Sequence, residues 1–581
     1  MTSLVEYYKP STQNLFQQLD SIEWTNLKQP QNYNPIYEEF FELSPSNANT
    51  IQLNHKFMLQ ELIAKDNDSI YNAVVYNNRN NETKKTNVFF KYSPLLDPIK
   101  FMMGKYEDND ITTPKFGSIN DTKIYQTNNS AYVDGFFNFL TNQLLHQYHF
   151  IHGIEYYGSF IGLKHGFKVN IEEELSMIHQ CDYYQQYKDS KFKILGNIED
   201  YLYNDSDSRN YKDKLTILPN ISLKSNLSIE SIDHEINELF SIPTPTNDIT
   251  ESPLTEHNIS IHNDENIDLN KKSNNTSLSS SSNCSSRSSI TDNRSDDDCD
   301  NEDDSEGESE NDSNDSNDDS ESVSTVSTSD ALHAEIDIFP VNMIALEKCD
   351  ITFDKYIMNE DISNAELCAA LMQIIMTLIT YQKCFKLTHN DLHTNNVMIC
   401  STEKQHIIYQ YDNKLYKVPT FGKIYKIIDF GRAIFTFKGH TYYSDSFSND
   451  GDATTQYNCE PYFNESKPKI EPNFSFDLCR LACSMFDLVI DEDKELKDLH
   501  DPLCKVIADW CTDDKGRNIL YKSNGEERYP GFKLYKMIAR TVHNHEPHKQ
   551  LERDIFSTYR VSKSKVNKKT RLINIDSMME M

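Results

Sequence analysis

The stretch LTHNDLHTNNVM, residues 387–398, places Asp391 and Asn396 on a polar turn. Further along the chain, KIIDFGRA, residues 426–433, adds Asp429 directly after an apolar run. Carboxylate and amide oxygens are ligands that Mg²⁺ prefers in proteins. A polar turn by itself is equally typical of a surface loop. The order of the segments around these three side chains therefore has to distinguish the two interpretations.

An apolar helix is predicted directly before this turn, from about Asn364 to Phe385. Its most apolar run, LCAALMQIIMTLITY from Leu367, is interrupted by Gln373. The run is also shorter than the roughly 20 residues that span a bilayer. We therefore expect a buried helix and no membrane segment.

The first half of the chain reads as strands with a single clear helix. SIYNAVVYN from Ser69 and TNVFFKYSP from Thr86 are rich in β-branched and aromatic residues, and a polar turn joins them as in a hairpin. A helix is predicted from Asn129, and strand-like character returns in HFIHGIEYYGSFIGLK from His149. A first half of strands with one helix, followed by a mainly helical second half, is typical of a two-lobed α+β protein.

The second half begins with a predicted buried strand in IDIFPVNMIALEKCDITFDKYI, residues 336–357, that leads into a short amphipathic segment. After the turn come a hairpin-like pair, QHIIYQY and KLYKVPTFGKIYKIIDFG, and a helix around FSFDLCRLACSMFDLVI. Further helical patterns follow.

An acidic, Ser-rich segment at about residues 221–330 interrupts the first lobe. Between Glu230 and Asp330 there are 27 Asp and Glu residues against 4 Lys and Arg, which is −23 of the formal net charge of −33. Such a composition cannot bury enough apolar surface to offset the entropy of ordering, so we predict a long disordered insertion between two strands. The acidity belongs to this segment and gives no reason to expect nucleic-acid binding by the folded part.

The 12 cysteines are scattered, without a CxxC pair or a zinc-type Cys/His cluster, which favours a reducing compartment. The first residues, MTSLVEYYKPSTQNLFQQ, lack the apolar segment of a secretory signal. We expect an intracellular protein that is not secreted.

Phosphoryl transfer requires metal ions on the phosphates, a cation on the phosphates and a carboxylate that orients the attacking hydroxyl. His389, Asp391 and Asn396 match H-x-D-x-x-x-x-N, the catalytic loop of protein kinases, and Asp429 opens D-F-G. The two motifs together, placed after a long apolar helix, indicate a kinase far more specifically than either motif alone.

The chain resembles the protein kinase-like fold, and its wording HNDLHTNN with KIIDFGRA is most similar to protein kinases of giant nucleocytoplasmic DNA viruses of the mimivirus type. The resemblance implies ATP and Mg²⁺ (or Mn²⁺) as cofactors, a protein substrate, and a place in host cytoplasm or virion. It leaves the oligomeric state open. The implied division is an N-terminal extension (1–50), a first-lobe part (51–220), the disordered insertion (221–330), the last first-lobe strand with the hinge (331–350), a helical second lobe (351–550) and a basic tail (551–581).

By motif position, the resemblance implies that Asp391 is the catalytic base and that Asn396 and Asp429 hold the metal. It implies that His389 braces the loop. His393 stands where serine/threonine kinases usually place a lysine on the γ-phosphate.

The resemblance also requires a strand lysine on the phosphates and an acidic partner from the next helix, for which Lys91 and Asp134 are the best candidates. Glu347 and Cys349 lie where the hinge would present backbone groups to adenine. The expected glycine-rich loop reads AKDNDS, with no glycine, and leaves Ser69 or the local backbone as a substitute contact.

Three further positions bear on control and substrate. Asp477 matches the buried aspartate that steadies the catalytic loop, although Asp also favours helix N-caps. Asn390 stands where many kinases have an arginine that binds a phosphate on the activation loop. Activation by phosphorylation of that loop is therefore not expected. TTQYNCEP, residues 454–461, resembles the substrate-positioning T-x-x-Y-x-A-P-E spacing, with Glu and Pro exchanged relative to the last two positions.

The leading interpretation is an ATP-dependent serine/threonine protein kinase. The missing glycines favour a pseudokinase that binds nucleotide or a partner without turnover. The D-L-H motif also resembles the corresponding motif of aminoglycoside and choline phosphotransferases. A small-molecule kinase is therefore a third interpretation.

Overall fold

In this computed structural model, the described residues are 7–8, 13–53, 56–118, 122–172, 174–196, 217–218, 332–490, 499–566 and 571–581. They all belong to the same structural unit. The predicted disordered insertion at 221–330 lies outside the described residues.

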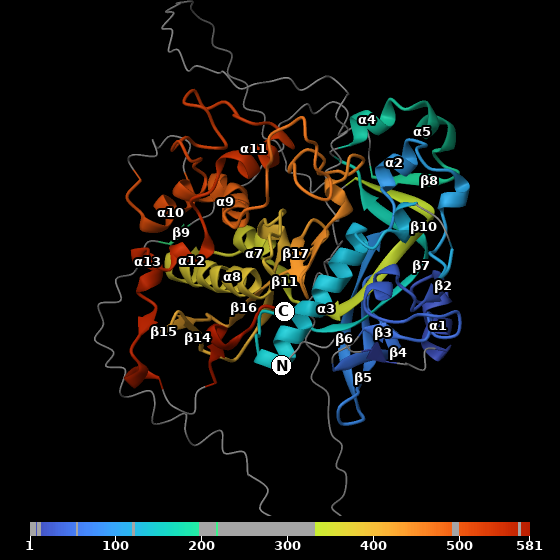
Figure 1. The fold of residues 1–581 in the computed structure, drawn as a ribbon, viewed down its shortest axis with the longest axis horizontal. Helices are drawn as coiled ribbons and strands as arrows, with labels where there is room; N and C mark the ends of the chain where they lie inside the picture. The colour runs from blue at the N-terminus through green and yellow to red at the C-terminus, as the bar shows by residue number, and fades with distance from the viewer. Residues whose placement is uncertain are drawn as a thin grey trace, which may run out of the picture. The chain divides into compact units, whose positions relative to one another are not determined.

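A seven-stranded antiparallel sheet contains most of the strands of the first half (Figure 1). The strand order is β2-β7-β10-β6-β5-β4, and β8 pairs with β10 beside β6. β4 also lies against β7, so the sheet is curled. The strands are β2 Leu27–Gln31, β4 Phe57–Lys65, β5 Ile70–Asn77, β6 Glu82–Pro94, β7 Tyr156–Asn170, β8 Phe192–Leu195 and β10 His333–Glu347.

The predicted hairpin is confirmed, because β5 and β6 pair from Ile70 with Phe89 to Asn77 with Glu82. β8 and β10 pair with each other in this sheet, and the short strand β9 and the acidic segment lie between them in the sequence. The short helices on the sheet side are α1 Gln13–Asp20, α2 Pro98–Met102, α4 Leu175–His179 and α5 Asp182–Tyr187.

The predicted helix at Asn129 is α3, Ser130–Tyr148. The Asn129 side chain accepts a hydrogen bond from the backbone N–H of Ala131, as an N-cap does. Residues of α3 belong to both hydrophobic clusters of the protein, one inside the sheet and one among the later helices. This helix therefore connects the sheet to the helical part.

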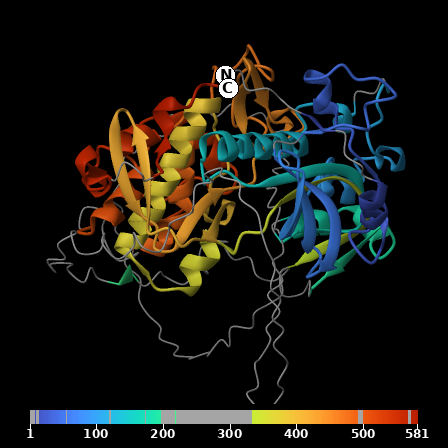
Figure 2. The ribbon, with the colours of Figure 1, turned by 90° about the horizontal axis from the view of Figure 1, so that it is seen from below.

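The later helices form the second hydrophobic cluster, and Figure 2 shows them, in yellow to red, beside the blue and green strands. The predicted helix Asn364–Phe385 is confirmed with these bounds as α8. By length and composition α8 is able to cross a membrane, but 89% of its apolar window is buried, which is typical of a core helix. The helices are α7 Phe353–Asn359, α8, α9 Phe476–Val489, α10 Pro502–Trp510, α11 Lys533–Thr541, α12 Pro547–Gln550 and α13 Asp554–Ser557.

A three-stranded sheet brings the two motif segments together. β13 Val397–Ser401 pairs antiparallel with β16 Lys423–Ile427, and Val397 lies opposite Ile427. The start of β13 therefore lies beside the end of β16, which places Asn396 next to the segment that carries Asp429. The third strand is β11 Ile351–Thr352.

The remaining strands form small sheets. The predicted pair after the turn is the hairpin of β14 and β15. These strands are β1 Tyr7–Tyr8, β3 Gln52–Leu53, β9 Ile217–Leu218, β12 Ile362–Ser363, β14 His406–Tyr411, β15 Lys414–Pro419, β17 Ile434–Phe437, β18 His440–Tyr443, β19 Arg560–Val561 and β20 Ile573–Asn574. The protein is thus mixed α and β with a curled antiparallel sheet, consistent with the predicted α+β class.

The expected N-terminal extension differs from the structure. Leu15, Leu19 and Leu27 are buried in the cluster inside the sheet, and β2 pairs with β7. β2 reads LKQPQ and has no alternation of apolar residues, because an edge strand tolerates Pro30 and few buried side chains. Its sequence therefore carried no strand signal.

The basic tail, residues 551–581, contacts the rest of the protein where it is described. β20 pairs with β14, and Lys383 at the end of α8 donates to the carbonyl of Ile575 at 2.6 Å. The backbone N–H of Met581 donates to the carbonyl of Cys384 at 2.9 Å. Residues 571–581 thus pack along α8, although the basic composition upstream suggested a solvated segment.

A buried histidine in the loop before β7 predicts a pH dependence of stability. His152 Nδ1 lies 2.8 Å from the carbonyl oxygen of Tyr425, and Nε2 lies 2.6 Å from the hydroxyl of Tyr409. Burial lowers the pKa of His152 to about 4. Below pH 6.5, His152 is protonated in the unfolded chain but stays neutral in the folded protein. The free energy of unfolding therefore falls as the pH drops from 6.5 toward 4. By pH 5 we expect a loss of about 2 kcal/mol from this group.

Urea unfolding of the wild type and His152→Asn at pH 7 and pH 5 checks this expectation. The variant should be less stable at pH 7 but should show a smaller pH dependence. His393 has a lowered pKa as well, so part of the dependence should remain. An identical pH slope in both proteins would contradict the assignment.

Candidate active site

A buried carboxylate holds the turn before Asp391. The backbone N–H groups of His389 and Asn390 donate to the two carboxylate oxygens of Asp477, each at 2.9 Å. Asn390 has a φ of 67°, so these bonds stabilise a backbone conformation that few residues adopt. Ser475 occupies the N-cap of α9, so the alternative that Asp477 caps the helix is wrong. The structure places Asp477 where it steadies the turn.

His389 links this turn to the strand before Asp429. Its Nδ1 accepts from the backbone N–H of Asp391 at 3.3 Å, so Nε2 carries the hydrogen and donates to the carbonyl of Ile428 at 2.9 Å. The ring lies against Phe430, with the ring centroids 5.3 Å apart. Both nitrogens are therefore used within the protein.

Asp391 is nearly buried and lies among cationic groups. The Tyr535 hydroxyl donates to Oδ1 at 2.8 Å, and Arg432 Nη1 lies 3.7 Å from Oδ2. Burial alone would raise the pKa of Asp391, but Arg432 and the other neighbours outweigh burial and hold the pKa well below its ordinary value. These further neighbours are His393, Arg480 and Tyr535. Asp391 is therefore ionised near neutral pH.

His393 is close to Asp391 but does not carry a positive charge near neutral pH. Its Nε2 lies 4.0 Å from Asp391 Oδ1. Burial lowers the pKa of His393 to about 4. A neutral imidazole can donate one hydrogen bond but cannot replace the charge of a lysine.

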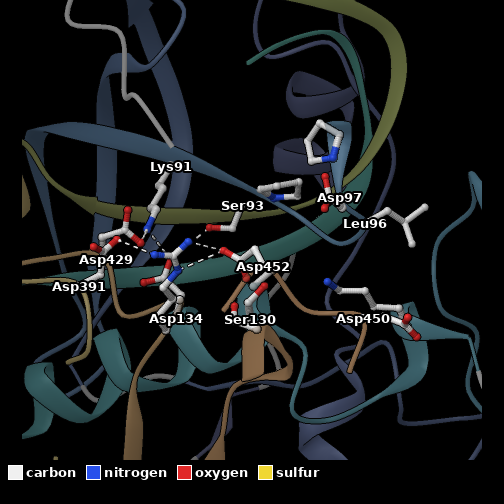
Figure 3. A pocket seen from close by; sticks show the side chains of 17 residues that line it. Lys91, Ser93, Leu96, Asp97, Ser130, Asp134, Asp391, Asp429, Asp450 and Asp452 are labelled. Carbon is white, nitrogen blue, oxygen red and sulfur yellow. Dashed lines mark hydrogen bonds and ion pairs between the residues drawn. The ribbon is translucent and has the colours of Figure 1, made fainter. Parts of the chain in front are cut away.

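Lys91 joins two carboxylates from distant parts of the chain (Figure 3). Its Nζ lies 2.6 Å from Asp134 Oδ2 and 2.8 Å from Asp429 Oδ1. Lys91 comes from β6, Asp134 from α3, and Asp429 from the segment after β16. The sequence predicted the first pairing from the order of the elements, and the structure brings these side chains together.

Asp134 also binds the backbone after Asp429. Its Oδ1 accepts from the N–H of Phe430 at 2.9 Å, and its Oδ2 accepts from the Ser93 hydroxyl at 3.1 Å. The short side chain reaches because α3 packs closely on the sheet at Gly135. A Cβ atom added there would lie 2.9 Å from Asn342 Nδ2. Close packing at this glycine thus allows the aspartate side chain to reach Lys91.

Asn396 and Asp429 have the oxygen donors that suit a hard cation. Asn396 Nδ2 donates to the backbone carbonyl of Asp391 at 2.9 Å, which leaves its Oδ1 as the free acceptor. Lys91 lowers the pKa of Asp429 against the opposing effect of burial. The described residues include no cluster of three His, Cys, Asp or Glu side chains able to hold a metal. Mg²⁺ is commonly bound by one or two protein groups plus phosphates and water, so the chemistry of these two donors fits such an ion.

The turn between β4 and β5 offers no backbone cradle. The N–H groups of Asp66 and Asn67 donate to the carbonyl of Ile70 at 3.0 and 3.2 Å. The N–H groups of Ser69 and Ile70 donate to Asn67 Oδ1 at 2.9 and 2.8 Å. These four donors are used inside the turn, so Ser69 does not offer its N–H as a substitute contact.

The structure does not bring Glu347 and Cys349 to the Lys91 cluster. The Glu347 carboxylate accepts from buried Lys426 and from the N–H of Glu155. The Glu347 N–H donates to the carbonyl of Glu155 at 2.9 Å. Cys349 lies against the thiol of Cys400. Neither predicted hinge residue lines the pocket at Lys91.

The segment after the DFG sequence is fastened to the start of α3. Asp445 Oδ1 accepts from the N–H of Ser130 at 2.9 Å, and Oδ2 lies 3.2 Å from Lys123 Nζ. The N–H of Asp445 donates to the carbonyl of Asn128 at 2.8 Å. A carboxylate is favourable at a helix N-terminus. The contacts of Asp445 therefore hold the segment in place by a carboxylate of the chain itself, with no need of a phosphate on this segment.

A pocket of about 110 Å³ lies at this cluster, and its lining includes Lys91, Asp134, Asp391, Asp429 and Arg432. Sites for drug-sized ligands usually measure roughly 300–1,000 Å³. The pocket in this conformation therefore suits a phosphate group better than a whole nucleotide.

Sequence reasoning missed Tyr535, Arg432 and Asp445. Arg432 directly follows the DFG sequence, and this adjacency was an available signal. Tyr535 lies 144 positions from Asp391, and no motif links the two.

No family model matches the chain. Over 128 residues the chain is 32% identical to a protein of Acanthamoeba polyphaga mimivirus named "Putative serine/threonine-protein kinase". The match covers 18% of this chain and 32% of that protein, so the chain spans about a third of the relative's length. This partial likeness supports a kinase-like relationship at a coarse level.

Proposed function

We propose that this chain has a two-lobed protein kinase-like fold and transfers the γ-phosphoryl group of ATP to Ser or Thr of protein substrates. The observation that carries the proposal is the position of Lys91 Nζ, 2.6 Å from Asp134 and 2.8 Å from Asp429. A lysine of the third strand in the β4-β5-β6 meander, paired with an acid of the long helix that follows and lying beside the DFG aspartate, matches the arrangement that kinases use. Lys91 and Asp429 are 338 positions apart, which makes a local cause of this contact implausible.

Asp391 would receive the acceptor hydroxyl. As the acceptor oxygen bonds to phosphorus and the bond from phosphorus to the ADP oxygen breaks, the hydroxyl proton passes to the Asp391 carboxylate. The lowered pKa of Asp391 keeps it ionised but makes it a weak base. Orientation of the hydroxyl should therefore contribute more than removal of its proton.

Lys91 would contact the phosphates, and Asp134 would keep the lysine in place. Asn396 and Asp429 would hold Mg²⁺ or Mn²⁺, which neutralises charge on the β- and γ-phosphates when bound. His393 can donate one hydrogen bond near the acceptor.

A protein acceptor is supported by the partial relative's name and by residues 454–461. The Tyr457 hydroxyl of this segment donates to Asn390 Oδ1 at 2.6 Å, so the segment lies against the turn that carries Asp391. A segment in that place can position a peptide beside the carboxylate.

The β4–β5 turn favours a second candidate, nucleotide or partner binding without turnover. A glycine-rich loop holds phosphates through free backbone N–H groups. Here four of those groups are bonded inside the turn. Phosphate positioning would then depend on Lys91 and the metal.

ATP turnover with Mg²⁺ or Mn²⁺ tests the proposal. The purified chain and Asp429→Asn should be incubated with generic protein acceptors and small alcohols, with nucleotide binding recorded on the same samples. We expect metal-dependent transfer to protein Ser or Thr by the wild type, and its loss in Asp429→Asn.

ATP binding without transfer to any acceptor would replace the proposal with the second candidate. Transfer only to small alcohols would assign a small-molecule kinase. Transfer that persists in Asp429→Asn would show that a different site, or a contaminant, is responsible.

A further inference from the structure

Tyr535 on α11 makes a direct contact with the carboxylate proposed as the base. Its hydroxyl donates to Asp391 Oδ1 at 2.8 Å, and its side chain is 1% exposed. The ring stacks on Phe532, with centroids 5.3 Å apart. Tyr535 is therefore held rigidly by the core of the helical part.

Two guanidinium groups lie over the Tyr535 ring. Arg480 Cζ is 4.9 Å and Arg432 Cζ is 5.7 Å from its centroid. Cation–π contacts of this kind hold the ring between two elements, because Arg480 is on α9 and Arg432 follows the DFG sequence. The hydroxyl direction is thus fixed relative to both.

The two oxygens of Asp391 have different surroundings. Oδ1 is engaged by Tyr535, whereas Oδ2 has Arg432 as its nearest cation at 3.7 Å. Asp391 and Arg432 line the pocket, and Tyr535 does not. Oδ2 is thus the oxygen beside the pocket-lining Arg432, and Oδ1 is bonded to a side chain outside the lining, so we expect a pocket-bound acceptor to meet Oδ2.

We propose that Tyr535 is a positioning residue that engages Asp391 Oδ1 and so presents Oδ2 to the acceptor hydroxyl. This role rests on the proposed function. In the transfer step, Oδ2 takes the acceptor proton while the new oxygen–phosphorus bond forms and the bond to ADP breaks.

Without the phenol hydroxyl, the carboxylate is free to rotate about its Cβ–Cγ bond. Arg432 and Arg480 would then draw it into a closer ion pair, in which Oδ2 no longer faces the acceptor. The rate of transfer should fall, while the nucleotide contacts of Lys91 should be unaffected.

Tyr535→Phe tests the role, because it removes one oxygen and keeps the ring between the arginines. We expect kcat to fall about tenfold to a hundredfold, the rate equivalent of one hydrogen bond to a charged group. The KM for ATP should stay within about twofold, since the nucleotide is held elsewhere. Tyr409→Phe is the matched control, because it removes another buried hydroxyl, the one bonded to His152.

A double-mutant cycle separates positioning from a general structural effect. In the Asp391→Asn background, Tyr535→Phe should change kcat by less than about twofold, because the group that it orients is already altered. An equal loss in both backgrounds would assign Tyr535 a structural role only. Unchanged kcat in Tyr535→Phe with an active wild type would overturn the positioning role alone. A wild type without turnover on any acceptor would overturn the proposed function and this role with it.

Discussion

Replacing Asp391 with alanine should lower the rate of phosphoryl transfer by roughly 10²- to 10⁴-fold, the usual contribution of a positioned general base. ATP binding should be nearly unchanged, because the proposed phosphate contact is Lys91 and the proposed role of Asp391 concerns the acceptor. The loss should appear in kcat, since the carboxylate acts on the acceptor hydroxyl as the bond to phosphorus forms.

The Asp391→Ala experiment measures initial rates at saturating ATP beside nucleotide affinity. Asp391→Asn is needed as well, because asparagine keeps the side-chain volume and an oxygen that accepts from Tyr535, whereas alanine also leaves a cavity at this position. Asp361→Ala, an exposed aspartate before α8, is the matched control and should retain full activity. Transfer at the wild-type rate in both Asp391 variants would exclude Asp391 as the base.

Replacing Lys91 with methionine should have the second large effect, on turnover and stability together. Methionine keeps most of the volume and removes the charge. Loss of a pre-placed charge on the reacting phosphates should cost about 10²–10³-fold in rate. Asp134 is 1% exposed, so removal of its cation should also destabilise the fold by about 3 kcal/mol.

Transfer rate, ATP affinity and urea unfolding of Lys91→Met check these two effects. Lys85→Met, an exposed lysine on the same strand, is the matched control. Adding Asp134→Asn to Lys91→Met should restore part of the lost stability, because it removes the uncompensated buried charge. Full ATP affinity and full stability in Lys91→Met would show that the ion pair has neither role.

The segments with strong periodicity were predictable from sequence. The β5–β6 hairpin, α3 and α8 carry alternating or helical apolar patterns, and the structure has each of them. β2 was not predictable, because a five-residue edge strand with Pro30 buries too few side chains to leave a pattern. The packing of residues 571–581 against α8 was not predictable for a different reason, because the segment buries Ile573, Ile575 and Met578 but is too short to show a periodic pattern.

The candidate site shows the same division. Asp391, Asn396 and Asp429 were visible because phosphoryl transfer requires them at nearly fixed spacing within short segments. Lys91 and Asp134 followed from the order of strand and helix. Glu347 and Cys349 were chosen by position along the chain for their backbone groups, and their contact with adenine stays a prediction; the Glu347 carboxylate itself is bonded to Lys426. A position in a strand does not specify the neighbours of a side chain.

By itself, the sequence determined which short segments are candidates for the chemistry and which elements they follow, because periodicity and motif spacing are local properties of the chain. Only the tertiary structure decided how Asp391 is held. Its carboxylate contacts Tyr535 of α11, 144 positions away, and Arg432 after the DFG sequence, and both contacts depend on how these segments pack around the turn. The close approach of α3 to the sheet at Gly135, which lets the short Asp134 reach Lys91, was likewise decided by packing. Such distances arise from the summed contacts of many residues, and no local pattern encodes them.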